Sequence, residues 1–291
     1  MSTKIIERII APQGTHFVGD GFRVHNFIPS VQGLSMERMS PFIMLDYNSK
    51  YVFPPTENLK GVGEHPHKGF ETVTIAYKGR VAHRDSSGGG GVIDEGDVQW
   101  MTAASGILHE EFHEESFNKT GGEFQMVQLW VNLPAKDKKS NPKYQAIANV
   151  EMTKVELPDN SGFVEVIAGS YNDKKGPAFT FTPVNMMNAK LNAGGKAHFS
   201  FPENYNTFLL VIEGEVKVNG DVVKTDNLVL FKNQGLDFQI EATENAVVLV
   251  LSGEPINEPI FAHGPFVMNT REEIVQAFDD FSRGKFGSIN A

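Results

Sequence analysis

The sequence predicts an all-β protein built from two β-barrels, with one helix near the C-terminal end of the chain. Three observations lead to this prediction. Short runs of β-branched and aromatic residues alternate with Gly, Pro, Asn and Asp, a helical period is nearly absent before residue 269, and the middle of the chain contains a weak internal repeat. With 291 residues, the chain is long enough for two ordinary domains.

The strand-like runs are short and are separated by residues that are typical of turns. Many short strands at regular spacing favour a sandwich or a barrel. Clear examples are Thr72–Tyr77, Gln125–Val131, Phe208–Ile212 and Ala246–Leu251.

The internal repeat aligns residues 65–81 with residues 200–216 without a gap, so that the apolar runs coincide. The identical pairs are Thr72 and Thr207, Gly79 and Gly214, and Val81 and Val216. Together with the strand spacing, this repeat predicts two similar β-domains. We expect an N-terminal domain over residues 1–148 that binds a metal, and a C-terminal domain over residues 149–291.

The predicted helix begins after Thr270, a good N-cap residue, and Glu273 three positions later has the spacing of a capping box. Gly284 is expected to end the helix. The residues that form its apolar face are Ile274, Val275, Phe278 and Phe281. We therefore expect a C-terminal helix that docks on a barrel.

Composition excludes several classes of protein. The chain has no cysteine, which rules out disulfides, iron–sulfur clusters and thiol catalysis. A formal net charge of −10 argues against direct binding of nucleic acid. The longest basic cluster, residues 136–139, is expected to be a solvated loop.

No feature of the sequence indicates a membrane or a secretory route. No apolar stretch approaches the length of a membrane-spanning helix, about 18 residues or more. The N-terminal apolar run is interrupted by Glu7 and Arg8 and is not typical of a signal peptide. We expect a cytoplasmic protein.

Two pairs of potential metal ligands stand out among the nine histidines. His65 and His67 lie two residues apart before a strand-like run, and His109 and Glu111 repeat this spacing after another. Residues two apart on a strand point to the same side, so both pairs can reach one ion inside a barrel. Three imidazoles and one carboxylate suit a divalent transition metal: Fe(II), Mn(II), Ni(II), Co(II), Cu(II) or Zn(II).

The second half of the chain lacks this ligand pattern. In the gapless alignment, Ser200 and Pro202 stand opposite His65 and His67, and no histidine occurs between His198 and His263. We therefore expect one metal ion per chain, held by the N-terminal barrel.

The motifs around these ligands resemble a known family. His65–Thr74 and Gly96–Glu111 resemble the first and second cupin motifs. With His83–Ser86, Leu129–Pro134 and Gly264–Asn269 they resemble the pirin family over most of the chain. The resemblance implies two cupin-type barrels (a bicupin), iron in the N-terminal barrel, and flavonol (quercetin) 2,3-dioxygenase activity in some members. It also implies that some eukaryotic members are nuclear co-regulators of transcription.

The identity of the carboxylate ligand is open between two residues. General cupin spacing points to Glu71, whereas the pirin pattern points to Glu111, which also shares its strand face with His109. We prefer Glu111, with Glu71 beside the ligands or on the outer face. His83 is expected to be structural or to line the rim, and His113 to be a surface histidine.

Four protein ligands leave two positions on a six-coordinate ion, which suits a substrate oxygen and O₂ together. We expect a small aromatic, flavonol-like substrate whose hydroxyl proton is taken by Glu111. Candidates for the pocket walls are Phe70, Trp100, Met101 and Phe112. Two other functions stay open: a metal or redox-sensing regulatory module that binds a protein partner, and metal-free cupin chemistry.

Overall fold

The computed structural model describes residues 2–289, which form two compact units. One unit consists of Gln13–Asn149 and the segment from Ile256 onward, and is called the histidine unit below. The second unit consists of the N-terminal segment up to Pro12 and Val150–Pro255. The predicted boundary at residue 148 placed the N-terminal segment in the first domain and the C-terminal segment in the second. The structure assigns each of these two segments to the other unit. No helix within residues 2–289 has the length and apolarity that a membrane crossing requires.

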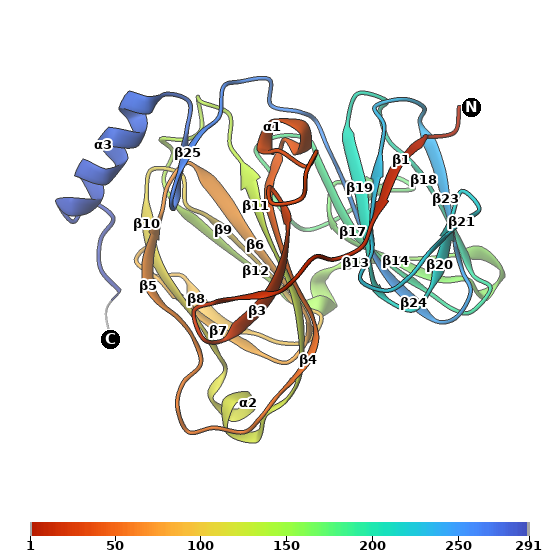
Figure 1. Ribbon diagram of the computed structural model, residues 1–291, viewed down its shortest axis with the longest axis horizontal. Coiled ribbons are helices and arrows are strands. Elements are labelled where there is room, and N and C mark those ends of the chain that lie inside the picture. Colours follow the sequence, from red (N-terminus) through yellow and green to blue (C-terminus); the bar gives the residue numbers. More distant parts are fainter. Residues whose placement is uncertain (1, 290–291) are drawn as a thin grey trace. The chain divides into compact units, whose positions relative to one another are not determined.

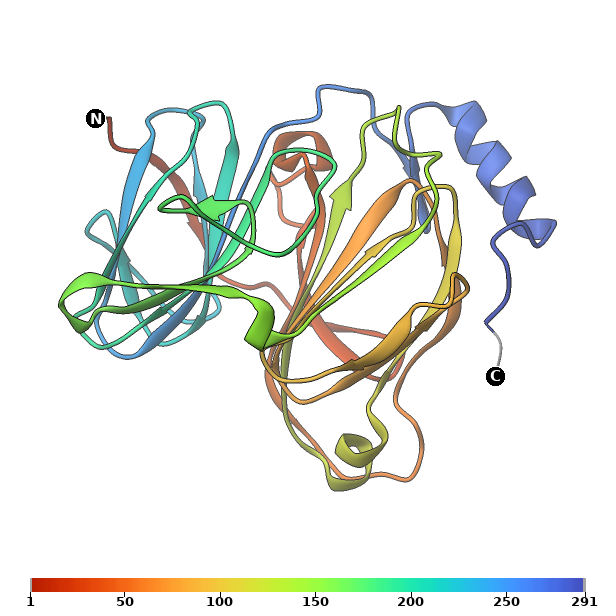
Figure 2. The same cartoon turned by 180° about the vertical axis from the view of Figure 1, so that it is seen from behind.

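The histidine unit contains a large and a small antiparallel sheet (Figures 1 and 2). The strands of the large sheet, in spatial order, are β12 (Lys143–Ile147), β9 (Val98–Thr102), β6 (Phe70–Lys78), β11 (Gly122–Asn132), β4 (Phe42–Phe53), β3 (Phe22–Ile28) and β2 (His16–Val18). The strands of the small sheet, in spatial order, are β5 (Gly61–His67), β10 (Ile107–His113), β7 (Val81–Asp85) and β8 (Gly90–Ile93). Val24 and Met126 of the large sheet share one apolar core with Val81 and Ile93 of the small sheet.

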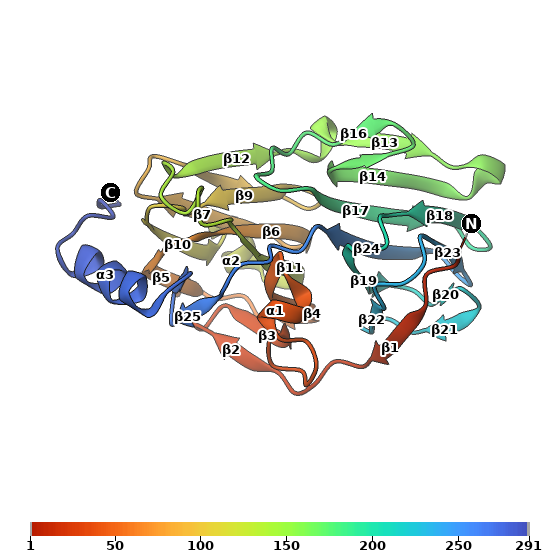
Figure 3. The ribbon, with the colours of Figure 1, turned by 90° about the horizontal axis from the view of Figure 1, so that it is seen from above.

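The second unit repeats this arrangement strand by strand (Figure 3). The strands of its large sheet, in spatial order, are β1 (Ile6–Ile10), β22 (Leu228–Phe231), β19 (Asn206–Glu213), β24 (Ala246–Gly253), β17 (Val184–Leu191), β14 (Gly162–Ala168) and β13 (Thr153–Glu156). The strands of its small sheet, in spatial order, are β18 (Lys196–Ser200), β23 (Asp237–Ala242), β20 (Val216–Val218) and β21 (Asp221–Val223). A strand pair of β15 (Ser170–Tyr171) and β16 (Lys174–Lys175) is added.

The N-terminal segment belongs to the second unit because β1 completes its large sheet. Ile10 pairs with Leu228 and Ile6 with Phe231 in antiparallel register. Two short 3₁₀ turns, Asn149–Glu151 and Pro158–Asn160, lie before and after β13 in the sequence. The prediction of an all-β chain with two similar barrels is confirmed.

In the part of the chain that the structure describes, three helices accompany the strands: α1 (Met36–Met39), α2 (Glu115–Thr120) and α3 (Arg271–Ser282). The predicted C-terminal helix is confirmed, and Thr270 accepts a hydrogen bond from the Glu273 N–H at 3.2 Å. Its buried face is narrower than predicted. Ile274 and Ala277 pack on the histidine unit, whereas Val275 is 63% exposed and the two phenylalanines of the predicted face are each 40% exposed.

The hairpin of β25 (Phe261–His263) and β26 (Phe266–Met268) precedes α3 and lies against the turn between β5 and β6. Lys68 exchanges two backbone hydrogen bonds with this hairpin, through Pro265 and Val267. Gly69 has φ +91, and a Cβ there would collide with the Val267 carbonyl oxygen. Glycine is therefore required where the hairpin meets the turn.

The prediction of a solvated basic loop at residues 136–139 is wrong for Lys138, which is 1% exposed. Its ammonium donates hydrogen bonds to the Gly69 oxygen at 2.7 Å, to Asn132 Oδ1 at 2.6 Å and to the Val267 oxygen at 3.0 Å. Burial lowers the pKa of Lys138 to about 7. Sequence composition alone does not reveal these three acceptors, because they come from distant segments.

Candidate metal centre

Three histidines meet on the inner face of the small sheet of the histidine unit. Strands β5 and β10 are antiparallel, and His109 pairs directly with His65 while Ile107 pairs with His67. The ring centroid of His109 lies 4.2 Å from that of His65 and 4.7 Å from that of His67. One nitrogen from each ring falls within 4.8 Å of the others, so the rings converge as strand alternation predicts.

The hydrogen bonds of these rings leave nitrogens free for a metal. His65 Nδ1 contacts the Gly63 oxygen at 2.8 Å, and His67 Nδ1 contacts the Pro265 oxygen at 3.4 Å, so each can present its Nε2. His109 is fully buried, and neither of its ring nitrogens has a hydrogen-bond partner. A buried polar atom without a partner is costly, and a bound cation would satisfy it.

The electrostatics of the cluster favour the neutral, metal-binding form of imidazole. Burial and the neighbouring His65 lower the pKa of His67 to about 3. Burial, reinforced by the surrounding histidines, holds the pKa of His109 well below its usual value. Neutral imidazoles carry the lone pair that a transition metal requires, so the donor set fits such an ion.

Glu111 lies on the same strand face as His109. Its Oε2 accepts a hydrogen bond from Gln128 Nε2 at 2.8 Å, and its Oε1 accepts one from Thr74 Oγ1 at 3.3 Å. One of its carboxylate oxygens lies within 4.8 Å of a ring nitrogen of His109 and of a ring nitrogen of His83. The structure thus brings Glu111 to His109 and His83, in a group separate from the one that His109 forms with His65 and His67. Strands β6 and β11 of the large sheet hold its carboxylate.

Glu71, the other carboxylate considered from the sequence, lies elsewhere. It is three residues from Thr74 on β6, so strand alternation places it on the opposite face of that strand from the Thr74 hydroxyl. Glu71 Oε1 accepts a hydrogen bond from Thr102 Oγ1 at 2.7 Å. Burial raises the pKa of Glu71 to about 7. It belongs to neither group of potential metal ligands among the described residues.

A cavity of about 370 Å³ opens onto this cluster. Its lining contains His65, His67 and Glu111. The remaining lining residues are Val18, Phe22, Val24, Met44, Asp46, Asn48, Val62, Met126, Gln128, Trp130, Gly264 and Pro265. The volume lies within the usual range for small-molecule sites, about 300–1,000 Å³. The walls are mainly apolar, with a few polar groups among them.

None of the residues predicted as walls lines this cavity. Phe70 is buried beneath Trp130, with the rings stacked at 4.2 Å. The walls come instead from strands β2, β3, β4 and β11. Trp130 lies within a block that resembles the pirin family, but a single strand sequence does not show which face meets the cavity.

Two polar cavity residues on β4 were not predicted. Asn48 is 2% exposed, and neither its amide nitrogen nor its amide oxygen has a hydrogen-bond partner. Asp46 accepts a hydrogen bond from Asn26 Nδ2 at 2.6 Å, and burial raises the pKa of its carboxyl. Alternation along β4 was the signal that would place both on one face.

His113 and His83 are both buried. The prediction of a surface histidine is wrong for His113, whose Nε2 contacts the Gly21 oxygen at 2.8 Å. Its ring is surrounded by Phe22, Phe53, Phe117 and Phe124. His83 is 1% exposed, and its ring lies 5.3 Å from that of His109.

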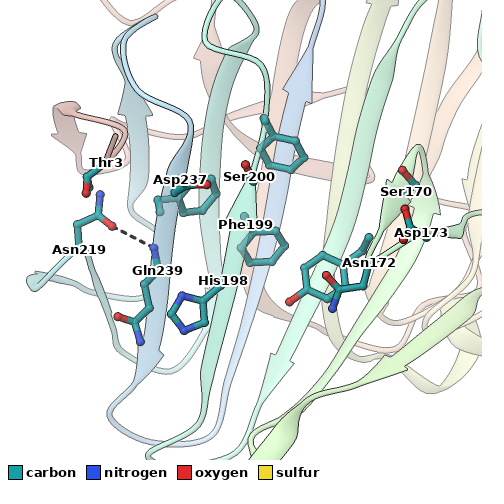
Figure 4. Close-up of a pocket in the computed structure, with 13 residues that line it drawn as sticks. Thr3, Ser170, Asn172, Asp173, His198, Phe199, Ser200, Asn219, Asp237 and Gln239 are labelled. Atoms are coloured by element: carbon teal, nitrogen blue, oxygen red, sulfur yellow. Dashed lines mark hydrogen bonds between the residues drawn. The ribbon is translucent and has the colours of Figure 1, made fainter. Parts of the chain in front are cut away.

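The matching position of the second unit is filled by aromatic side chains. Phe199 of β18 pairs with Phe238 of β23, and their rings stack at 5.2 Å. Ser200, the residue aligned with His65, is exposed and pairs with Asp237, so the gapless alignment does not hold in this strand. Figure 4 shows these strands beside a pocket of about 1000 Å³, whose described lining residues include one histidine, His198.

Comparison with known proteins identifies the family. The pirin family model matches residues 21–131, and the model of the pirin C-terminal cupin domain matches residues 186–287. The chain belongs to the pirin family. The two barrels are therefore cupin domains, which confirms the predicted bicupin fold.

Individual relatives extend this likeness over nearly the whole chain. A Pseudomonas aeruginosa protein, provisionally named a quercetin 2,3-dioxygenase, is 47% identical over 93% of this chain and 94% of its own. A crystal structure described as quercetin 2,3-dioxygenase from Acinetobacter baumannii is 48% identical, covers 99% of this chain and 100% of its own, and superposes with a TM-score of 0.92. A bacterial pirin from Escherichia coli, described in complex with nickel(II), shares the fold at 20% identity and a TM-score of 0.64, over 85% of this chain and 99% of its own.

Proposed function

We propose that this chain is a metal-dependent dioxygenase of the pirin type that cleaves a flavonol such as quercetin with O₂. The observation that carries the proposal is the fully buried His109, with both ring nitrogens unpaired, in a histidine cluster at a cavity of about 370 Å³. The names of the relatives from Pseudomonas aeruginosa and Acinetobacter baumannii support the substrate class.

The proposed ligands of the metal are His65, His67, His109 and Glu111. Fe(II) is the proposed ion, and the nitrogen and oxygen donors also suit Mn, Ni, Co, Cu or Zn. A divalent transition metal in this position supplies Lewis-acid chemistry and, for redox-active ions, a route for electrons between substrate and O₂.

The protein residues bind the substrate and move its proton. Glu111 is the proposed general base, and it accepts the proton of the flavonol hydroxyl. Gln128 and Thr74 hold the Glu111 carboxylate in place, which limits the reorganisation that proton transfer requires. The unpaired amide of Asn48 is available to hydrogen-bond a polar group of the substrate. The apolar walls exclude water from the flavonol rings.

The experiment that tests this proposal mixes anaerobically Fe(II)-loaded protein with quercetin and then adds O₂. We expect the flavonol absorbance to fall catalytically. The Glu111→Gln variant keeps the shape of the side chain but cannot act as a base, and we expect its rate to fall by about 10²–10⁴-fold. A flavonol absorbance that stays unchanged with the unsubstituted, metal-loaded protein would rule out quercetin as a substrate.

A further inference from the structure

His83 and Asp85 face the metal ligands from the strand next to them. Strand β10 lies between β5 and β7 in the small sheet. On its β7 side, Glu111 pairs with His83 and His109 pairs with Asp85. Paired residues of neighbouring strands point to the same face, so both β7 side chains are directed toward the cluster.

The carboxylate of Asp85 fixes the orientation of the His83 ring. His83 Nε2 lies 3.3 Å from Asp85 Oδ2. The other carboxylate oxygen, Oδ1, accepts hydrogen bonds from the Ser87 N–H at 2.8 Å, from the Ser87 hydroxyl at 2.7 Å and from the Gly89 N–H at 3.0 Å. The three donors at Oδ1, together with the contact to His83 at Oδ2, favour the ionised form of Asp85. An ionised Asp85 only accepts, so His83 Nε2 carries the proton.

The glycine-rich turn after β7 is shaped to hold this carboxylate. A Cβ at Gly89 would collide with Asp85 Oδ2 and with the Tyr144 side chain. The Tyr144 ring stacks on the His83 ring at 5.3 Å, with an interplanar angle of 19°. Asp85, the turn and Tyr144 together hold His83 in one position.

The remaining nitrogen of His83 is an acceptor without a donor. His83 Nδ1 is buried and has no hydrogen-bond partner, and the same is true of both nitrogens of His109. One ring nitrogen of His83 lies within 4.8 Å of one ring nitrogen of His109. A histidine that binds a metal through one nitrogen almost always donates its other N–H to a neighbouring acceptor. His65 and His67 have backbone carbonyls for this purpose, but His109 has none.

We propose that His83 is the positioning residue of the metal centre: its Nδ1 accepts the N–H of the His109 nitrogen that does not bind the metal, and Asp85 fixes His83 for this role. The inference rests on the metal centre proposed above. This hydrogen bond would give a partner to two buried nitrogens that have none in the structure. The chain His109–His83–Asp85 orients the third histidine ligand, as carbonyl oxygens orient the other two.

The test compares metal binding by the unsubstituted protein and three variants. Affinity for Co(II) is measured by competition with a chelator, and the number of imidazole ligands by pulsed EPR of the Cu(II)-loaded protein. We expect His83→Ala to lower the affinity by about 10–100-fold and to keep three imidazoles on the metal. We expect His83→Asn, whose side-chain oxygen can replace Nδ1 as acceptor, to recover part of the lost affinity. His198→Ala, which removes an exposed histidine of the second unit, should change neither value.

The outcomes distinguish a failure of this inference alone from a failure of the proposed metal centre. Affinity that is unchanged in His83→Ala would overturn the positioning role and leave the metal centre intact. Loss of one imidazole from the metal in that variant would make His83 a direct ligand, which also overturns the inference. Failure of the unsubstituted protein to bind any of these metals would overturn the metal centre and this inference together. If His83→Ala does not fold, Asp85→Asn tests the same chain, with a smaller expected loss of affinity.

Discussion

At the scale of single residues, Glu71 and Glu111 are buried carboxylates of the first cupin barrel that have opposite environments. Glu111 is held by amide and hydroxyl donors beside His109, whereas Glu71 accepts a hydrogen bond from the Thr102 hydroxyl and lies on the other face of β6. The environment of Glu71 disfavours its charge, and the pKa of Glu71 is raised to about 7.

This raised pKa predicts a pH dependence of stability. Between the ordinary pKa of 4.5 and the folded value of about 7, the folded protein binds a proton that the unfolded chain releases. The free energy of unfolding therefore falls as pH rises through this window, by roughly 3 kcal/mol from this group. Glu71→Gln removes this contribution. Urea denaturation of both metal-free proteins at pH 5 and pH 8 should show a smaller pH difference for the variant; equal differences would contradict the assignment.

The site residues that could be predicted from the sequence are those with a recognisable local pattern. His65, His67, His109 and Glu111 appear as pairs at a spacing of two, and strand alternation then places each pair on one face. Asp46 and Asn48 have the same spacing of two, but nothing in their sequence neighbours shows that this face of the strand meets a cavity. The burial of Lys138 was also hidden, since a lysine among lysines is usually solvated.

At the scale of elements, the C-terminal hairpin and the β5–β6 turn support the candidate ligands. The turn follows directly after His67, and Pro265 of the hairpin contacts the ring of that histidine. Lys138 joins the two elements through the Gly69 and Val267 carbonyls. Strand positions could be predicted from the sequence because alternation is local, but this packing depends on residues nearly 200 positions apart.

Lys138→Ala tests the importance of this connection. The substitution leaves three buried acceptors without a donor, so we expect the free energy of unfolding to fall by roughly 2–4 kcal/mol. Lys136→Ala, in the same basic cluster but exposed, is the matched control and should change stability by less than about 0.5 kcal/mol. Chemical denaturation measures both. Equal stability of the two variants would show that the buried ammonium contributes little.

At the scale of the whole molecule, the two cupin domains share one strand order, but candidate metal ligands gather in only one of them. Within residues 2–289, both groups of three or more potential ligands lie in the histidine unit. In the second unit, Phe199, Phe238 and Phe231 fill the matching region. The repeated strand order could be predicted from the sequence repeat. The sequence did not predict that β1 belongs to the second unit and α3 to the histidine unit, because each of them packs against residues far away in the sequence.

The metal content of the protein tests the central claim most directly. Element analysis is carried out on protein purified without added metal, and on the His109→Ala variant treated identically. We predict close to one transition-metal ion per chain in the unsubstituted protein, with little or none in the variant, since His109 belongs to both groups of candidate ligands. Unsubstituted protein without a transition metal, or equal metal content in the two proteins, would contradict the proposed centre.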